Sequence, residues 1–199
     1  MKHLWQLGKR VLRIVRHDNR AAQIVEFAVS LPLLVVFVVG IFDFSGAYTL
    51  KQKLTNIAAA AARTAADDTS TDLQSTLPMS VVDGFDVITN FMRTNNMDNC
   101  GITASGSPTI LTWTFTKTSG GCSLTIVINR GYYYPVTGSA LPGVTCTSQA
   151  PAGQLAVIGT CVSIQYRYPW KFGQAASLLG RAITLPNQIS AVAVVVNDN

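Results

Sequence analysis

The chain has 199 residues, of which 48% are hydrophobic and only 13% are charged, and its formal net charge is +5. Charged residues make up about 25% of an ordinary soluble domain, so this composition indicates a segment in lipid and excludes a mostly disordered chain. The excess positive charge belongs to a basic leader over residues 1–21, in which Lys2, Lys9, Arg10, Arg13, Arg16 and Arg20 accompany one acid, Asp18. Because bases and acids are equal in number beyond the leader, we expect no nucleic-acid-binding face.

An uncharged apolar run, Phe27–Phe42, follows the basic leader. About 20 apolar residues cross a bilayer, so the stretch Ile24–Tyr48 predicts a membrane-spanning helix that tolerates Pro32 with a local kink. The positive charges before this run predict a cytoplasmic N-terminus and an exported chain after about residue 50.

The helical pattern continues beyond the apolar run, because Lys51–Ala66 is rich in alanine and contains neither Gly nor Pro. We therefore predict one long helix over Ala22–Ala66, whose part outside the bilayer forms a rod suited to close packing against other helices. A signal anchor followed by an unspecialised connecting helix explains the same pattern. The sequence pattern alone does not distinguish this interpretation from the packing rod.

Glu26 stands at the start of the apolar run, where a carboxylate either extends to the lipid headgroups or has a specific partner. Its surroundings, Arg20-Ala21-Ala22-Gln23-Ile24-Val25-Glu26-Phe27, resemble the cleavage region of class III (type IVb-like) prepilins. The resemblance implies that a prepilin peptidase cuts between Ala21 and Ala22, with Ala21 in place of the usual Gly. The new amino group would then lie one helical turn from Glu26 and pair with such a carboxylate when subunits stack by their helices.

A wider stretch, Arg20–Ala66, is similar to the N-terminal motif of the TadE/TadG-like family of tight-adherence (Flp) pilus assembly proteins. The matching pieces are Val25-Glu26-Phe27-Ala28, Leu31-Pro32-Leu33, Gly40-Ile41-Phe42-Asp43-Phe44, Ala47-Tyr48 and Leu54-Thr55-Asn56. The resemblance implies a pilin-like subunit that assembles through its helix with other pilins or pseudopilins. We expect the packing positions of this helix at Phe27, Pro32, Gly40, Phe44 and Tyr48.

The chain beyond the long helix predicts a polar linker over residues 67–79 and an exported α+β domain over residues 80–199. Apolar residues at spacings of three and four predict an amphipathic helix over Ser80–Asn96, followed by a loop over Asn95–Pro108. This domain is expected to be an antiparallel sheet of four or five strands covered by one or two helices.

Alternating apolar residues at 111–115 and at 124–128 predict a β-hairpin whose loop is Lys117–Gly121. The remaining elements predicted from the sequence are strands at Tyr132–Thr137, Leu155–Tyr168 and Ile189–Asn197, and a short helix at Gly173–Arg181.

All four cysteines follow the apolar run, at Cys100, Cys122, Cys146 and Cys161. An even number in an exported domain predicts two disulfides, for which three connectivities are possible. We favour Cys100–Cys122 and Cys146–Cys161, which join cysteines adjacent in sequence and each close a loop around the start of a strand. A zinc site is disfavoured, because no two cysteines have the CxxC spacing and no histidine is nearby.

Catalytic chemistry has little support in the sequence. Both histidines, His3 and His17, lie in the leader, and no nucleophile-elbow, metalloprotease or phosphate-loop motif occurs. We therefore expect no enzyme activity, no cofactor and no metal. The late aromatic residues Tyr166, Tyr168 and Trp170 are interpreted as packing on the sheet, in preference to a surface patch for a sugar or a partner.

Together these features predict a minor pilin or pilus-assembly pseudopilin of a bacterial inner membrane, with an exported domain that provides adhesion or specificity. Two alternatives stay open. A signal-peptidase cut before Tyr48, after the small residues Ser45 and Ala47, would release a secreted binding domain. Without any cut, the chain would be a single-pass anchor that scaffolds a secretion machine.

Overall fold

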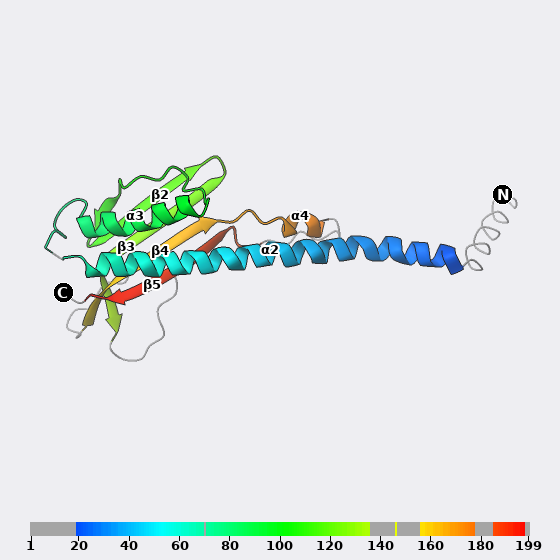
Figure 1. Cartoon of the computed structure of the whole chain (residues 1–199), viewed down its shortest axis with the longest axis horizontal. Helices are drawn as coiled ribbons and strands as arrows, with labels where there is room; N and C mark the ends of the chain where they lie inside the picture. Colours follow the sequence, from blue (N-terminus) through cyan, green and yellow to red (C-terminus); the bar gives the residue numbers. More distant parts are fainter. Residues whose placement is uncertain (1–18, 70, 136–145, 147–155, 178–184, 198–199) are drawn as a thin grey trace, which may run out of the picture. The chain divides into compact units, whose positions relative to one another are not determined.

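The computed structural model describes residues 19–69, 71–135, 146, 156–177 and 185–197 (Figure 1). The chain divides into two compact units. Unit 1 comprises Met1–Ser45 and Trp170–Leu185, and unit 2 comprises Gly46–Pro169 and Pro186–Asn199. Residues 1–18 of the basic leader lie outside the described residues.

The long helix α2 spans Asn19–Asp67 and contributes residues to both units (blue to cyan in Figure 1). It confirms the predicted helix Ala22–Ala66, with slightly wider bounds and with Pro32 inside it. Its alanine-rich part provides a narrow surface for close packing, and Ala58, Ala61 and Ala65 are completely buried. The helix ends at two consecutive acids, which are unfavourable beside the negative end of the helix dipole.

Unit 2 contains a five-stranded antiparallel sheet in which every strand pairs with its neighbours in sequence, in the order β1-β2-β3-β4-β5. The predicted α+β class is therefore confirmed. The bounds of the strands are β1 Ser107–Thr109, β2 Thr112–Ser119, β3 Cys122–Pro135, β4 Ala156–Arg167 and β5 Gln188–Val196.

One face of the sheet packs against α3 (Met79–Thr94) and the second half of α2. The alternating apolar residues of β2 and β3 point into this core, which explains why they are buried: Trp113, Phe115, Leu124, Ile126 and Ile128. α3 approaches α2 closely at Gly84, where an added Cβ would lie 3.2 Å from the Ala65 Cβ atom and 3.3 Å from the Ala61 carbonyl oxygen.

The hairpin between β2 and β3 has a shorter turn than the sequence predicted. The expected loop Lys117–Gly121 is wrong, because β2 continues to Ser119 and the turn consists of Gly120 and Gly121 alone. Their φ angles are +56° and +88°, which glycine adopts without steric cost and which two-residue hairpin turns require.

The predicted strand Tyr132–Thr137 is not a separate element. Its residues up to Pro135 form the end of β3, which continues past a β-bulge between Asn129 and Tyr132; residues 136–137 lie outside the described residues. A bulge adds a residue to one strand and interrupts the alternation, so the sequence pattern resembled two strands. The edge strand β1 was not predicted, since two of its three residues, Ser107 and Pro108, fall within the expected loop Asn95–Pro108.

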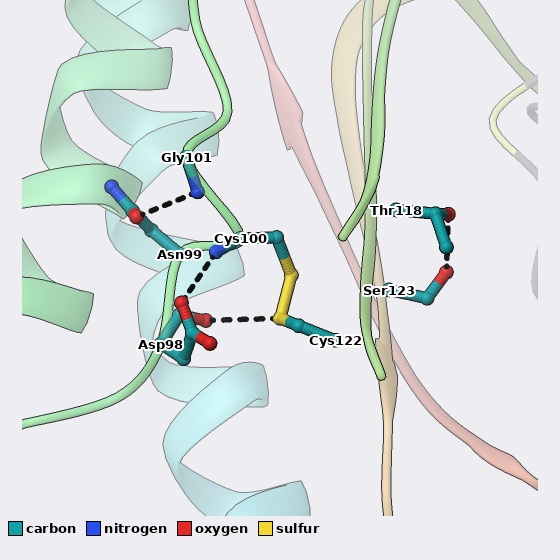
Figure 2. The surroundings of a disulfide bond; sticks show 7 residues. All are labelled: Asp98, Asn99, Cys100, Gly101, Thr118, Cys122 and Ser123. Atoms are coloured by element: carbon teal, nitrogen blue, oxygen red, sulfur yellow. Dashed lines mark hydrogen bonds between the residues drawn. A yellow bond between two sulfur atoms is a disulfide. The ribbon is translucent and has the colours of Figure 1, made fainter. Parts of the chain in front are cut away.

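Two disulfides join Cys100 to Cys122 and Cys146 to Cys161, the pairs favoured from the sequence. The first links the loop after α3 to the start of β3 (Figure 2). Two loop side chains support this bend: Asp98 Oδ1 accepts the Cys100 N–H at 2.8 Å, and Asn99 Oδ1 accepts the Gly101 N–H at 3.1 Å.

The second disulfide packs beside Tyr132, on the face of the sheet that carries Val127, Val192 and Val194. The neighbouring Asn129 amide donates to the Cys146 carbonyl oxygen at 2.6 Å. This bond and the disulfide hold Cys146 against β3 and β4.

Candidate functional site

Unit 1 presents an extended apolar helix surface. By length and composition, Ala22–Asp67 is the one helix among the described residues that can cross a membrane. Large apolar side chains are exposed along its first half, including Phe27 at 66%, Val29 at 70% and Phe42 at 75%. Water disfavours such a continuous apolar surface, so the helix is a candidate single-pass membrane anchor.

A short segment of unit 1 is attached to this helix through Asp43, which is only 7% exposed. The Asp43 Oδ2 atom accepts the backbone N–H groups of Lys171 at 2.9 Å and Phe172 at 2.8 Å. Phe172 begins the six-residue helix α4 (Phe172–Ser177), whose first N–H groups have no partner within the helix. Asp43 therefore caps α4 from a position 129 residues earlier in the chain.

Aromatic contacts complete this attachment. The Phe44 ring centroid lies 5.3 Å from that of Trp170 and 5.7 Å from that of Phe172, both in tilted geometry. Phe172 also packs directly over Gly40, where an added Cβ would lie 2.9 Å from the Phe172 ring. We call Trp170–Ser177 the docked segment, because Asp43, Phe44 and Gly40 hold its first residues on the helix.

Glu26 and Asp43 lie in a stretch of α2 that is similar to a known protein family. A family model described as TadE-like protein matches residues 21–63. This stretch is similar to TadE-like proteins, and we call residues 21–63 the TadE-like segment. The resemblance expected over Arg20–Ala66 is thus confirmed within these bounds. No curated protein and no solved structure matches the chain.

The expected packing positions of the TadE-like segment fall into two groups. Phe27, Pro32 and Tyr48 are exposed, whereas Gly40 and Phe44 contact the docked segment of the same chain. Part of the helix that was expected to receive partner helices therefore already carries an intramolecular contact.

The processing and charge-pairing residues lie at the start of the TadE-like segment. Ala21 and Ala22 belong to the first turns of α2, and Glu26 is exposed one turn later. The Glu26 backbone carbonyl accepts the Ser30 hydroxyl at 2.8 Å. Residues 1–18 of the leader lie outside the described residues, and the cut between Ala21 and Ala22 stays a prediction.

Unit 2 contains a buried cation that the sequence analysis did not single out. Arg130 lies at the bulge of β3 and is 1% exposed. Its guanidinium donates to the carbonyl oxygens of Ala65 and of Asp68, the latter at 2.9 Å, and to Thr160 Oγ1 at 3.0 Å. The last carbonyls of a helix lack intrahelical partners and carry partial negative charge, so Arg130 caps the C-terminal end of α2.

Two pKa shifts accompany this cap. Burial lowers the pKa of Arg130, and the negative charges of Asp68 and Asp72 oppose that shift. Burial raises the pKa of Asp68, and Asp83 raises it further through charge repulsion and a side-chain hydrogen bond. Among the described residues, no group of three or more His, Cys, Asp or Glu side chains is placed to hold a metal ion.

Two functional groups were missed by reasoning from sequence: the Asp43 cap of the docked segment and the Arg130 cap of α2. The sequence analysis named Asp43 only as part of the family motif. Arg130 is a single base within an apolar strand. A charge inside an apolar pattern is the signal that both share, since a buried charge requires specific partners.

Proposed function

We propose that the protein is a minor pilin or pilus-assembly pseudopilin of a tight-adherence (type IVb/Flp-like) pilus, and that it is not an enzyme. The observation that carries the proposal is the TadE-like match at residues 21–63, which supports involvement in Tad pilus assembly. The first part of the matched stretch exposes large apolar side chains, and the same helix α2 continues to Asp67, with its alanine-rich part buried in unit 2. Such a chain can insert in a bilayer, pack by its helix and display a folded domain.

The basic leader favours an orientation with the N-terminus in the cytoplasm and unit 2 exported from the inner membrane. Two disulfides in unit 2 support the exported location, because disulfides persist in oxidising compartments. We further propose that a prepilin peptidase removes the leader between Ala21 and Ala22. The displayed domain then provides adhesion or specificity for other pilus components.

Glu26 is the residue to which we assign the assembly step. After the cut, the new amino group of Ala22 lies about 6 Å along the helix axis from Glu26. An exposed carboxylate on an apolar helix is costly once other apolar helices surround it, unless a cation pairs with it. The pairing of Glu26 with the amino group of a neighbouring subunit would fix the stagger between the two helices.

The processing proposal is tested by the intact mass and N-terminal sequence of the chain purified from its native membrane. We expect a chain that starts at Ala22 and contains two disulfides. A start at Tyr48 would remove the apolar helix and indicate a secreted binding domain instead. An intact Met1 would indicate an unprocessed anchor and would overturn the processing step.

The assembly proposal is tested with Glu26→Ala, compared with Ser30→Ala as a matched control. Both residues are exposed and lie one helical turn apart, but only Glu26 is charged. Sheared filaments and membranes are probed for the chain by immunoblotting. We expect Glu26→Ala to reduce the filament fraction at least tenfold, corresponding to a loss of about 1.4 kcal/mol per contact, while Ser30→Ala leaves it unchanged. Equal incorporation of both variants would overturn the role of Glu26.

A further inference from the structure

The docked segment combines aromatic rings and a cation at one end of the apolar helix. Trp170 and Phe172 are half-buried against Phe44, and Lys171 between them is exposed. We propose that Trp170–Phe172 is an interfacial anchor, which lies in the lipid headgroup layer at the C-terminal end of the membrane-spanning part of α2. The inference rests on the proposed insertion of this helix in a membrane.

The level of the docked segment along the helix supports this placement. From Glu26 to Asp43 the helix rises about 26 Å, and all residues between these two acids are uncharged. The hydrocarbon core of a bilayer is about 30 Å thick, so the two acids fall near its opposite boundaries. Trp170 and Phe172 contact Phe44, the residue after Asp43, and therefore lie at the same boundary.

The chemistry of the segment matches the headgroup layer. Tryptophan and other amphipathic rings gather at membrane interfaces, where the ring meets acyl chains and the polar edge meets water or headgroups. Lysine extends its charge towards lipid phosphates while its methylene stem stays on apolar surface. On the preceding turn of α2, the side chains of Ile41, at 69%, and Phe42, at 75%, are also exposed, so the helix is apolar on the membrane-core side of Asp43.

Asp43 acts as a positioning residue for the anchor. A carboxylate at the membrane boundary is costly without hydrogen-bond donors, and the N–H groups of Lys171 and Phe172 supply two donors to Oδ2. The same bonds occupy the first N–H groups of α4. Release of the docked segment would therefore expose both the carboxylate and these N–H groups, which favours the attached state.

The test uses the full-length chain reconstituted into vesicles of phosphatidylcholine and phosphatidylglycerol that contain lipids brominated near the headgroup or near the chain end. Bromine quenches tryptophan fluorescence at short range. The difference between the wild type and Trp170→Phe isolates the signal of Trp170. Trp113 is the internal control, because it is 1% exposed in the core of unit 2 and donates to the Thr76 carbonyl oxygen.

We expect the lipid brominated near the headgroup to quench Trp170 at least about twofold more strongly than the lipid brominated near the chain end, because interfacial rings lie at headgroup level. Quenching by neither lipid, in a chain that floats with the vesicles, would overturn the anchor and leave the membrane insertion intact. A chain that does not float would overturn both the anchor and the insertion on which the proposed function depends. If Trp170 became less accessible to the brominated lipids as the protein concentration increased, its ring would be assigned to a contact between protein chains, and the anchor would also be overturned.

Asp43→Ala and Asp43→Asn test the positioning role. Ala removes the acceptor, whereas Asn keeps a carbonyl oxygen in the same place. We expect Asp43→Ala to reduce the headgroup-level quenching of Trp170 at least twofold, with recovery in Asp43→Asn, while the emission of Trp113 stays constant in both. Unchanged quenching of Trp170 in Asp43→Ala would overturn the positioning role.

Discussion

Replacement of Arg130 by methionine tests whether the buried guanidinium holds the C-terminal end of α2 against the sheet. Methionine keeps most of the length and apolar volume of the side chain and removes its charge and its donors. Three hydrogen bonds are lost, to the carbonyl oxygens of Ala65 and Asp68 and to the Thr160 hydroxyl. Ala65 and Thr160 are 0% exposed, so water does not replace the lost donors without rearrangement.

The expected loss follows from these contacts. Hydrogen bonds to a charged group contribute about 1.5–3 kcal/mol each, so the sum over three such bonds is an upper bound on the free energy of unfolding that Arg130→Met loses. The bound is not reached, because burial of the guanidinium is itself unfavourable, as the lowered pKa of Arg130 indicates. Removal of one member of a buried charged network costs about 3–5 kcal/mol, and we expect a loss near the lower end of that range for methionine.

The assay is urea unfolding of the full-length chain in detergent micelles, followed by the fluorescence of the buried Trp113. Arg63→Met is the matched control, because Arg63 is an exposed base of α2, the helix whose end Arg130 caps. We expect the control to change the free energy of unfolding by no more than about 0.5 kcal/mol. Equal free energies of unfolding for Arg130→Met and Arg63→Met would refute the cap.

Three further variants probe unit 2 with the same unfolding assay. Asp68→Asn should raise the unfolding midpoint at pH 7, because the raised pKa of Asp68 means that its charged form is disfavoured in the folded state. In the wild type, stability therefore increases as the pH falls from above the folded-state pKa of Asp68 to the ordinary pKa of an aspartate. The variant should lack this increase, and superimposable pH profiles of the two proteins would contradict the argument. Gly84→Val should cost about 1–3 kcal/mol by forcing α3 away from α2, so an unchanged midpoint would exclude the close contact. Opening the Cys100–Cys122 disulfide, which spans 22 residues, by Cys→Ser at both positions should cost about 3 kcal/mol, and a midpoint equal to that of the wild type would show that the loop is held by other contacts.

The sequence predicted those parts of the fold that depend on local pattern. The long helix follows from an apolar run joined to an alanine-rich stretch, and the ends of α2 lie within three residues of the prediction. The alternation along 111–115 and 124–128 predicted the pairing of β2 with β3. The disulfides follow because adjacent cysteines flank the start of β3 and of β4.

The parts that were missed depend on contacts between residues far apart in sequence or on breaks in a pattern. The bulge of β3 interrupts the alternation, so one strand was predicted as two. The Asp43 contacts join residues 128 and 129 positions apart, and a charge inside an apolar run indicates that Asp43 has partners but not which residues they are. Arg130 was overlooked because its burial depends on helix carbonyls that only the tertiary structure brings to it.

The docked segment lies between β4 and β5, and the two ends of this connection meet. The Tyr168 N–H donates to the Asn187 carbonyl oxygen at 3.1 Å, next to the last paired residues, Arg167 and Gln188. The segment is thus an insertion at the tip of a β-hairpin whose alignment is already fixed by its own ladder. Because loop length affects stability only weakly, this insertion can be lengthened, shortened or exchanged between proteins as a module without changing how the strands pair.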